Sequence, residues 1–332
     1  MNQNLITPEE ASAMILRGDR LLLAGDIALL SQLPKGNWIG GTTPFFILYP
    51  EHQVTSYEKL FVTKLPDYVL KTTIQEYDET NIKEIYNDAE KLGNVFTLLI
   101  MPYGSQVSKD FASNATYYEN FACRPLSGWL TGRPLDSIMT EPSYAVSGVE
   151  AKAYTDKAFA MHIELPDTKY AELHIFNPFR QGKGDEISFE ANGDILTDAI
   201  INGKKRNFAE YLREIGYDPK LPFVADYSGA MINVTCCGIT DKEVIVSPPV
   251  FQNIEYRIAE IDDNISEPTL LSDTILYSIT CIGNFIQPDI CAQYLRKMHG
   301  PVVYGEVAYQ LLGQTTVYIT VDDIPNFEIE KA

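Results

Sequence analysis

The chain has 332 residues, of which 45% are hydrophobic and 21% charged, an ordinary globular composition that suits two domains or one large two-lobed body. Its net charge of −19, from 45 acidic and 26 basic residues, argues against nucleic acid and anionic membranes as partners. No apolar run approaches the roughly 20 residues that cross a bilayer, and the N-terminus lacks a signal-peptide pattern. With five cysteines and no CxxC pair, we expect reduced thiols and a cytoplasmic location.

The first elements have clear boundary signals. Thr7-Pro8-Glu9-Glu10 predicts the start of a helix and Gly18 its end, because a hydroxyl cap, an early proline and first-turn acids favour a helix N-terminus. An apolar strand at Leu21–Gly25, a short helix at Ile27–Leu33 and a second strand at Asn37–Thr42 then predict a strand–helix–strand unit.

The next segment combines helices, a buried strand and a long irregular stretch. Asn94–Met101 predicts a buried strand that leads through Pro102–Ser105 into a helix. Ligands gather where strand ends feed helix N-termini, although a plain connection is the alternative. Residues 123–148 resemble a loop that is either a working loop or a linker. Within it, Arg124 and Arg133 are candidate clamps for an acidic ligand, with surface salt bridges as the alternative.

Two hairpins are predicted in the middle of the chain. Phe159–Leu165 and Tyr170–Phe176 alternate apolar and polar residues around a short turn, which would place His162 opposite His174. With two glutamates on the same face these histidines suggest a transition-metal site, whereas the wet face of a sheet is the alternative. Asn192-Gly193 predicts a second hairpin, and further strands follow up to residue 261.

The C-terminal part repeats the strand–helix–strand pattern. Ile275–Cys281 predicts a strand, residues 287–299 a helix, and Pro301–Val307 a second strand that contains Tyr304-Gly305-Glu306. Because Lys35–Gly41 can be laid over His299–Gly305, we interpret the two units as a duplication, with chance similarity as the rival.

These residues resemble FIST domains, which are bacterial intracellular sensory modules thought to bind small ligands. Cys281-Ile282-Gly283 and Val303–Ala308 are similar to the C-terminal FIST part, and Trp38–Thr42 is similar to the glycine-rich strand of the N-terminal part. The resemblance covers roughly the first 50 and the last 60 residues, as in a stand-alone FIST-like branch. It departs from the family pattern at Asn284, where a basic residue is expected, so the resemblance does not imply anion binding at that point.

The resemblance implies a fold class and a domain division. We expect an α+β fold of two related halves, with mixed, largely antiparallel sheets flanked by helices. Residues 1–150 would form a FIST-N-like half and residues 151–332 a FIST-C-like half, packed as one body.

The expected function is small-ligand binding of a sensory, FIST-like type, with a signal passed to a separate signalling protein. The predicted pocket lies between the halves and is lined by Gly40, Gly41, Thr42, Thr43, Arg133, Cys281, Gly283, Asn284, Tyr304, Gly305 and Glu306. The alternatives are glycines that only allow close packing, a hydrolase using Cys281 or Glu306, and a scaffold that binds proteins through exposed tyrosines. No cofactor is predicted, although haem, which some FIST-like sensors bind, would take His162 or His174 as a ligand.

Overall fold

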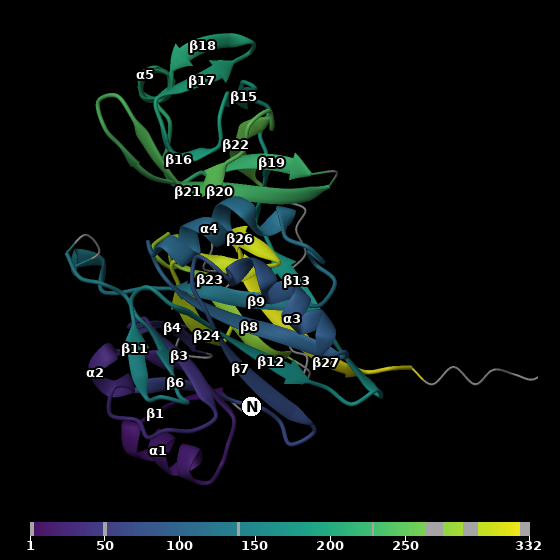
Figure 1. Cartoon of the computed structure of the whole chain (residues 1–332). Helices are drawn as coiled ribbons and strands as arrows, with labels where there is room; N and C mark the ends of the chain where they lie inside the picture. Colours follow the sequence, from purple (N-terminus) through teal and green to yellow (C-terminus); the bar gives the residue numbers. More distant parts are fainter. Residues whose placement is uncertain are drawn as a thin grey trace, which may run out of the picture.

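The computed structural model describes residues 3–48, 52–137, 140–227, 229–262, 275–287 and 298–325. It shows an α+β fold with several mixed sheets and few helices, as predicted. Figure 1 shows a large body built from the two ends of the chain, with a smaller lobe above it that carries β15–β22 and α5. Among the described residues, no helix is long and apolar enough to cross a membrane.

The body contains three six-stranded sheets, and one connectivity recurs in each of them within the described residues. An edge strand is followed by two parallel central strands joined through a helix, then by a hairpin and a return strand. The first unit comprises β1 (Gln3–Ile6), β2 (Leu21–Gly25), α2 (Ile27–Leu30), β3 (Trp38–Thr42), β4 (Phe45–Leu48), β5 (His52–Thr55) and β6 (Leu60–Lys64).

The second unit comprises β7 (Lys71–Tyr77), β8 (Val95–Pro102), α4 (Gln106–Asn114), β9 (Leu126–Thr131), β10 (Ala145–Ser147), β11 (Lys152–Tyr154) and β12 (Ala158–Glu164). The third comprises β13 (Lys169–Phe176), β23 (Ile275–Cys281), α6 (Ile282–Phe285), β24 (Gly300–Val303), β25 (Glu306–Ala308), β26 (Gln310–Leu312) and β27 (Thr316–Asp323). Each hairpin joins the sheet of a neighbouring unit: β4 pairs with β24, β10 with β3, and β25 with β9. The three sheets are therefore interlocked in a ring.

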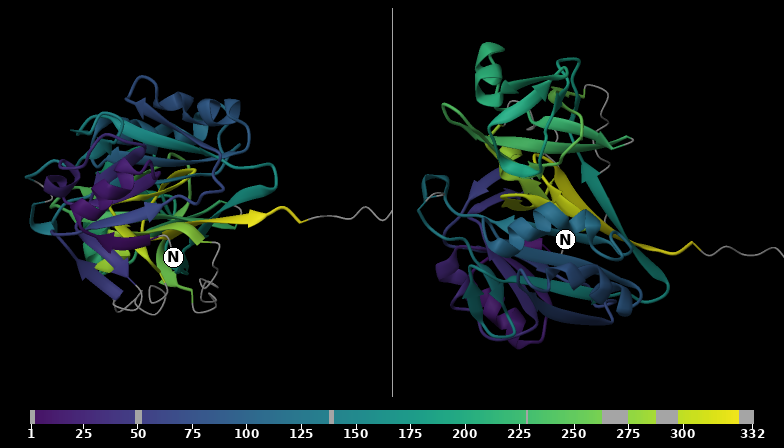
Figure 2. Two further views of the ribbon diagram at one scale, coloured as in Figure 1. Left: turned by 90° about the horizontal axis from the view of Figure 1, so that it is seen from below. Right: turned by 45° about the horizontal axis from the view of Figure 1, so that its top comes forward.

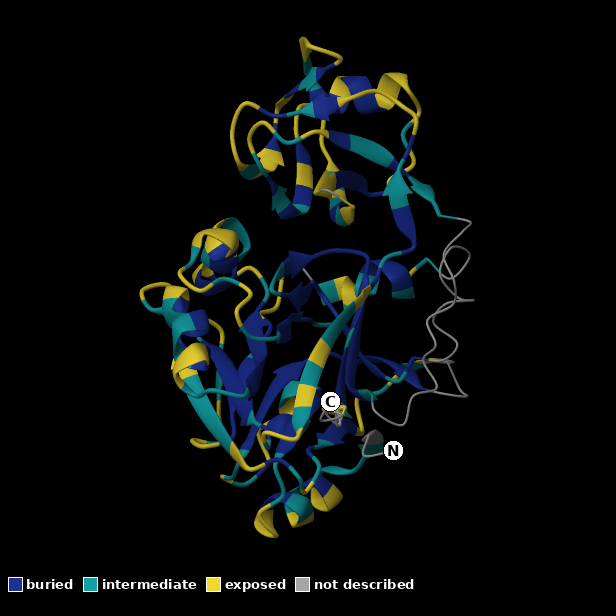
Figure 3. Cartoon of the chain, turned by 90° about the vertical axis from the view of Figure 1, so that its right-hand side faces the viewer, coloured by how far each residue is buried: buried dark blue, intermediate teal, exposed yellow. Residues whose placement is uncertain are grey.

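The three sheets enclose one central core. Leu22 of β2, Ile100 of β8 and Ile279 of β23 belong to the same buried cluster, so one face of every sheet points inward. The other faces form separate clusters. Described helices lie on each of these outer faces. Helix α1 (Pro8–Leu16) lies on the first sheet, and α3 (Ile85–Lys91), α4 and the short helices η1 (Ile82–Glu84) and η2 (Ala115–Tyr117) lie on the second. The short helix α6 packs on the third. Figure 3 shows the body strands as mainly buried.

The smaller lobe is an insertion between β13 and β23, and Figure 2 shows it on one side of the body. Its nine-stranded sheet has its own buried cluster around Phe208, Phe223 and Tyr256. The strands are β14 (Phe179–Gln181), β15 (Ile187–Ser188), β16 (Gly193–Leu196), β17 (Asp198–Ile201), β18 (Lys204–Asn207), β19 (Phe223–Tyr227), β20 (Ala230–Ile239), β21 (Val244–Val250) and β22 (Tyr256–Ile261). One helix, α5 (Phe208–Glu214), packs in this cluster.

The helix-capping and strand signals of the sequence predicted several elements correctly. The Thr7 side chain and Glu10 form the expected capping box of α1, and both predicted strand–helix–strand units contain a parallel strand pair. The predicted helix at residues 287–299 lies largely outside the described residues. The division at residue 150 stays a prediction; Glu150 lies in the turn between β10 and β11, which pair with each other.

The hairpin predicted for Phe159–Leu165 and Tyr170–Phe176 is wrong. Strand β12 pairs with β7 on one edge and β8 on the other, so it has no free edge for β13. Strand β13 pairs with β27 in a different sheet. The Asn192-Gly193 hairpin is correct in part. Its predicted arms, Asp185–Ala191 and Ile195–Ile201, contain β15 and β17, which pair antiparallel. The predicted tight turn is wrong, because Gly193 begins β16, which pairs with β21.

Two further predictions were wrong in extent. The loop predicted at residues 123–148 contains β9, the short helix η3 (Leu135–Ser137) and β10. The strand predicted at Pro301–Val307 is two strands in different sheets, because the chain leaves β24 at Tyr304 and enters β25 at Glu306. Gly305, with a φ of +151°, lies at this crossing rather than within a strand, which explains the requirement for glycine there. Gly41 lies within β3, so the two glycines are not equivalent.

Candidate functional site

Each of the three units contains two parallel central strands, and the ends of the second strand of each pair, β3, β9 and β24, converge. The convergence of β3 and β24 was predicted. The Gly132 N–H donates to the Thr42 carbonyl at 2.6 Å, and the Leu130 N–H donates to the Gly305 carbonyl at 2.9 Å. The Thr43 hydroxyl donates to the Val302 carbonyl at 2.7 Å. Backbone from β3, β9 and the crossing after β24 therefore meets in one place, and β9 was not predicted to take part.

Side chains fill the space beside the glycines at this meeting point. A Cβ atom added to Gly41 would lie 2.6 Å from both Thr131 and Trp129, and one added to Gly40 would lie 3.2 Å from the Leu23 carbonyl. A Cβ on Gly305 would lie 3.0 Å from Leu311. These close approaches match the packing alternative, in which glycine allows elements to touch rather than a ligand to enter.

The predicted threonines also have structural partners. The Thr42 Oγ1 atom accepts a hydrogen bond from the Tyr144 N–H at 3.0 Å, and Thr43 is fully buried with its hydroxyl bonded to β24. Each hydroxyl thus ties one strand end to another segment of the body. Neither threonine lines either of the two cavities described below.

Four other predicted residues lie in or beside a buried acid–thiol cluster, which we define as Cys281, Glu306 and Thr315. Glu306 is fully buried, and its Oε1 atom accepts hydrogen bonds from the Thr315 N–H and the Thr315 hydroxyl, both at 2.6 Å. Its Oε2 atom has no hydrogen-bond partner within the described residues. Asn284 is buried beside the cluster and donates to the Thr315 carbonyl at 3.2 Å, while Gly283 packs against Gln314.

Burial controls the acid–base behaviour of this cluster. Burial raises the pKa of Glu306 to about 7, while the hydrogen bonds from Thr315 and Cys281 act in the opposite direction. Burial, and then the neighbouring Glu306 charge, raises the pKa of the Cys281 thiol well above its usual range. Cys281 is only 4% exposed, so it lacks both the access and the lowered pKa of a reactive cysteine.

The two candidate arginines have different surroundings. Arg124 forms a salt bridge with Glu90, with the Arg124 Nε and a Glu90 carboxylate oxygen 2.9 Å apart. Arg133 forms no ion pair with the described residues, and its Nε atom is buried without a partner. Its carbonyl accepts a hydrogen bond from the Tyr304 hydroxyl at 2.5 Å, and the Tyr304 ring packs edge-on against Tyr103. Burial raises the pKa of Tyr103, which lines a cavity, and the nearby Arg133 charge acts in the opposite direction.

That cavity lies between the body and the inserted lobe and has a volume of about 370 Å³. On the body side it is bordered by Tyr103, Gly104 and the first turns of α4, including Lys109, with Leu130 and Leu311 also lining it. On the lobe side it is bordered by β16, β20 and β21, through residues that include Asp194, Cys237, Ile245, Val246, Ser247 and Pro249. The turn at residues 102–105 was the sequence signal for this site, but nothing local indicated that a lobe would face it.

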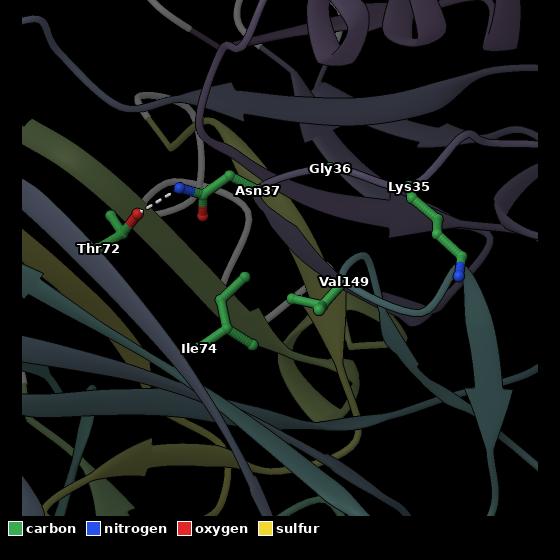
Figure 4. Close-up of a pocket in the computed structure, with 6 residues that line it drawn as sticks. All are labelled: Lys35, Gly36, Asn37, Thr72, Ile74 and Val149. Carbon is green, nitrogen blue, oxygen red and sulfur yellow. Dashed lines mark hydrogen bonds between the residues drawn. The ribbon is translucent and has the colours of Figure 1, made fainter.

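A second hollow of about 470 Å³ lies at the surface near β3 and β7 (Figure 4). Lys35, Asn37, Thr72, Ile74 and Val149 line it, and the Asn37 amide donates to the Thr72 hydroxyl at 2.7 Å. Val149 is 55% exposed, and the hollow is wide open to solvent. It would therefore bury less of a ligand than the cavity between body and lobe.

The predicted metal face does not form, because His162 and His174 lie in different sheets. The His162 ring nitrogens are within hydrogen-bonding distance of the Thr97 and Tyr77 hydroxyls, at 2.8 and 3.3 Å, and burial lowers the pKa of His162 to about 4. His174 stacks on Tyr318. No group of three histidine, cysteine or acidic side chains in the described part of the chain is arranged to hold a metal ion.

Comparison with known proteins gives a family but no characterised relative. No curated protein and no solved structure matches the chain. The model of a family of unknown function, DUF6976, matches residues 6–322, so the match spans the body and the inserted lobe. The chain therefore belongs to the DUF6976 family.

Proposed function

We propose that this chain is a cytoplasmic small-ligand-binding protein of a sensory type, and that the ligand occupies the cavity between α4 and the inserted lobe. The observation that carries the proposal is the cavity itself, about 370 Å³ with walls from two parts of the fold. Binding sites are commonly concave, lie between domains and combine apolar walls with a few polar groups.

The walls favour an amphipathic ligand. Leu130, Leu311 and Val246 are buried apolar residues of the lining, whereas Lys109 and Asp194 are exposed charged residues of the same lining. Neither charged side chain forms an ion pair with another described residue. A molecule with an apolar part and at least one charged or strongly polar group would satisfy both kinds of wall.

The position in the fold supports the same conclusion. The cavity adjoins the point where β8 ends and α4 begins, and ligands in α/β sheets bind outside the carboxyl ends of parallel strands. The FIST resemblance of the two chain ends points to small-ligand sensing as well, and it remains part of the proposal. The hydrolase alternative loses support because the Cys281 thiol is buried and its pKa is raised.

The test combines ligand discovery with a matched pair of variants. Native mass spectrometry of the purified protein, and a thermal-shift screen of metabolites, should each reveal a small molecule that binds. Ile245→Trp places a large ring in the cavity wall, whereas Ile215→Trp makes the same change at a similarly exposed position of the lobe that does not line the cavity. Binding should be lost in the first variant and kept in the second. Equal binding by both variants, or a screen without any bound molecule, would overturn the proposal.

A further inference from the structure

A single turn connects the buried acid–thiol cluster to the inserted lobe. The turn Gly313–Thr315 joins β26 to β27, and Figure 1 shows β26 directly below β20 and β21 of the lobe. Gln314 within the turn is fully buried and has a positive φ of 51°, which is uncommon for a residue with a side chain. Such a conformation persists only where surrounding contacts hold it.

The lobe contacts this turn through two hydrogen bonds and close packing. The Asn233 side chain of β20 donates to the Gly313 carbonyl at 3.1 Å, and the Gln314 side chain donates to the Lys220 carbonyl at 3.0 Å. Gly313 also packs tightly, because a Cβ there would lie 2.6 Å from the Thr235 hydroxyl and 3.2 Å from the Ser247 carbonyl. The position of the lobe is thus fixed to the position of this turn.

The body contacts the same turn through Glu306. Both hydrogen bonds that Thr315 donates from its N–H and hydroxyl end on Glu306 Oε1, and the Thr315 carbonyl accepts from the Cys281 N–H at 3.1 Å. The turn also adjoins the cavity, since Leu311 of β26 and Ser247 of β21 both line it. Glu306 is therefore directly hydrogen-bonded to the turn that contacts the lobe beside the cavity.

No basic side chain of the described residues pairs with Glu306. Within the described residues, the titratable group that acts on it is the Cys281 thiol at the end of β23. Strands β9 and β26 place Trp129 and Leu312 opposite it, and Lys220 contributes its carbonyl to the turn rather than its charge to the carboxylate. An ionised Glu306 is consequently a buried negative charge with one unpaired oxygen.

We propose that Glu306 is a proton-controlled latch: while it is neutral the Gly313–Thr315 turn and the lobe stay closed over the cavity, and its ionisation favours an open arrangement in which water reaches the carboxylate. The hydrogen bonds from Thr315 favour the ionised form, but the full burial of Glu306 outweighs them. The physical reason is linkage, because the arrangement that buries the carboxyl binds a proton more tightly than one in which water reaches it. Raising the pH therefore favours the open arrangement. The effect on ligand affinity rests on the function proposed above, whereas the latch itself does not.

The Thr315 amide gives a direct readout, since its N–H donates to Glu306. Hydrogen exchange of the ligand-free protein is measured at pH 6 and pH 8 for wild type and Glu306→Gln, which keeps the Oε1 acceptor but cannot ionise. A carboxyl whose pKa is about 7 when closed and 4.5 when solvated predicts roughly tenfold more opening at pH 8 than at pH 6. Comparison at each pH cancels the intrinsic pH dependence of exchange.

The expected result is that wild type, but not Glu306→Gln, shows the roughly tenfold rise at Thr315 and a parallel rise along β21. The latch would be overturned if the ratio of the wild-type exchange rate at Thr315 to that of the variant were the same at both pH values. A faster exchange at Thr315 without any change in β21 would also overturn it. Thr315→Val provides a second check if Glu306→Gln does not fold. It removes a hydrogen bond that favours the charged form, so the midpoint should move to higher pH.

The two proposals fail in distinguishable ways. A protein without any ligand but with the pH-dependent exchange would refute the proposed function and leave the latch intact. A ligand whose affinity does not change between pH 6 and pH 8, together with flat exchange in wild type, would refute the latch and leave the binding function intact.

Discussion

Replacing Glu306 by glutamine should change how the stability of the whole protein depends on pH. Burial raises the folded-state pKa of Glu306 from 4.5 to about 7, so the folded protein holds this proton more tightly than the unfolded chain does. The contribution of Glu306 to stability is therefore fully present below pH 4.5 and is lost as the pH rises through about 7. A tenfold difference in proton affinity between the folded and unfolded states corresponds to about 1.4 kcal/mol, which gives a loss of roughly 3 kcal/mol by pH 8.

Urea unfolding at pH 5, 6, 7 and 8 measures this effect, with tryptophan fluorescence as the signal. Trp129 is suited to the purpose because it is buried and lies opposite Glu306 in the strand pair of β9 and β25. The difference in unfolding free energy between wild type and Glu306→Gln cancels the titration of the other carboxylates. Part of the loss has already occurred at pH 5, so this difference should shift by roughly 2.5 kcal/mol in favour of the variant between pH 5 and pH 8. A flat difference would refute the reasoning, because it would mean that Glu306 has an ordinary pKa in the folded protein.

Three other predictions concern the glycines, a histidine and the thiols. Gly41→Ala should destabilise the fold by about 1–3 kcal/mol through overpacking, whereas Gly184→Ala, in open space, should change little; equal melting temperatures for the two variants would contradict the packing account. Burial lowers the pKa of His162 to about 4, so its contribution to folding stability is present above pH 6.5 and is lost as the pH falls through 4. Urea unfolding of wild type should show a loss of roughly 3 kcal/mol over this range, and His162→Gln should not show it. Alkylation at pH 8, mapped by peptide mass spectrometry, should modify exposed Cys237 well before buried Cys281, and the reverse order would revive the nucleophile hypothesis.

Local chemistry made several elements predictable. The capping box of α1 depends on residues Thr7 to Glu10 alone, and the parallel units contain strand and helix signals within about 25 residues of each other. The composition of these segments determines which element they form. Glycine at position 305 was correctly taken as a sign of unusual backbone, because its φ of +151° disfavours other residues.

Strand pairing was not predictable in the same way, because the partner of a strand is chosen by distant residues. β12 looked like one arm of a hairpin, but β7 and β8 occupy both of its edges. The convergence of β3 and β24 was anticipated, whereas the recurrence of the same unit around β8 and β9 was missed, since its sequence has no obvious similarity to the other two.

The candidate site was predicted only in part. Cys281, Gly283, Asn284 and Glu306 do lie together, but they form a buried cluster behind the cavity rather than its lining. The lining comes from the turn around Gly104 and from the inserted lobe, and only the three-dimensional position of that lobe closes the cavity. Sequence reveals a strand end that feeds a helix, but it does not reveal what packs over it.

The most direct test of the account is a crystal structure of the protein with the molecule found by the binding screen. We expect electron density between α4 and β21, in contact with Tyr103 on the body side and Ser247 on the lobe side. Density at the surface hollow near Asn37, or beside Gly41 at the convergence of the strands, would contradict it.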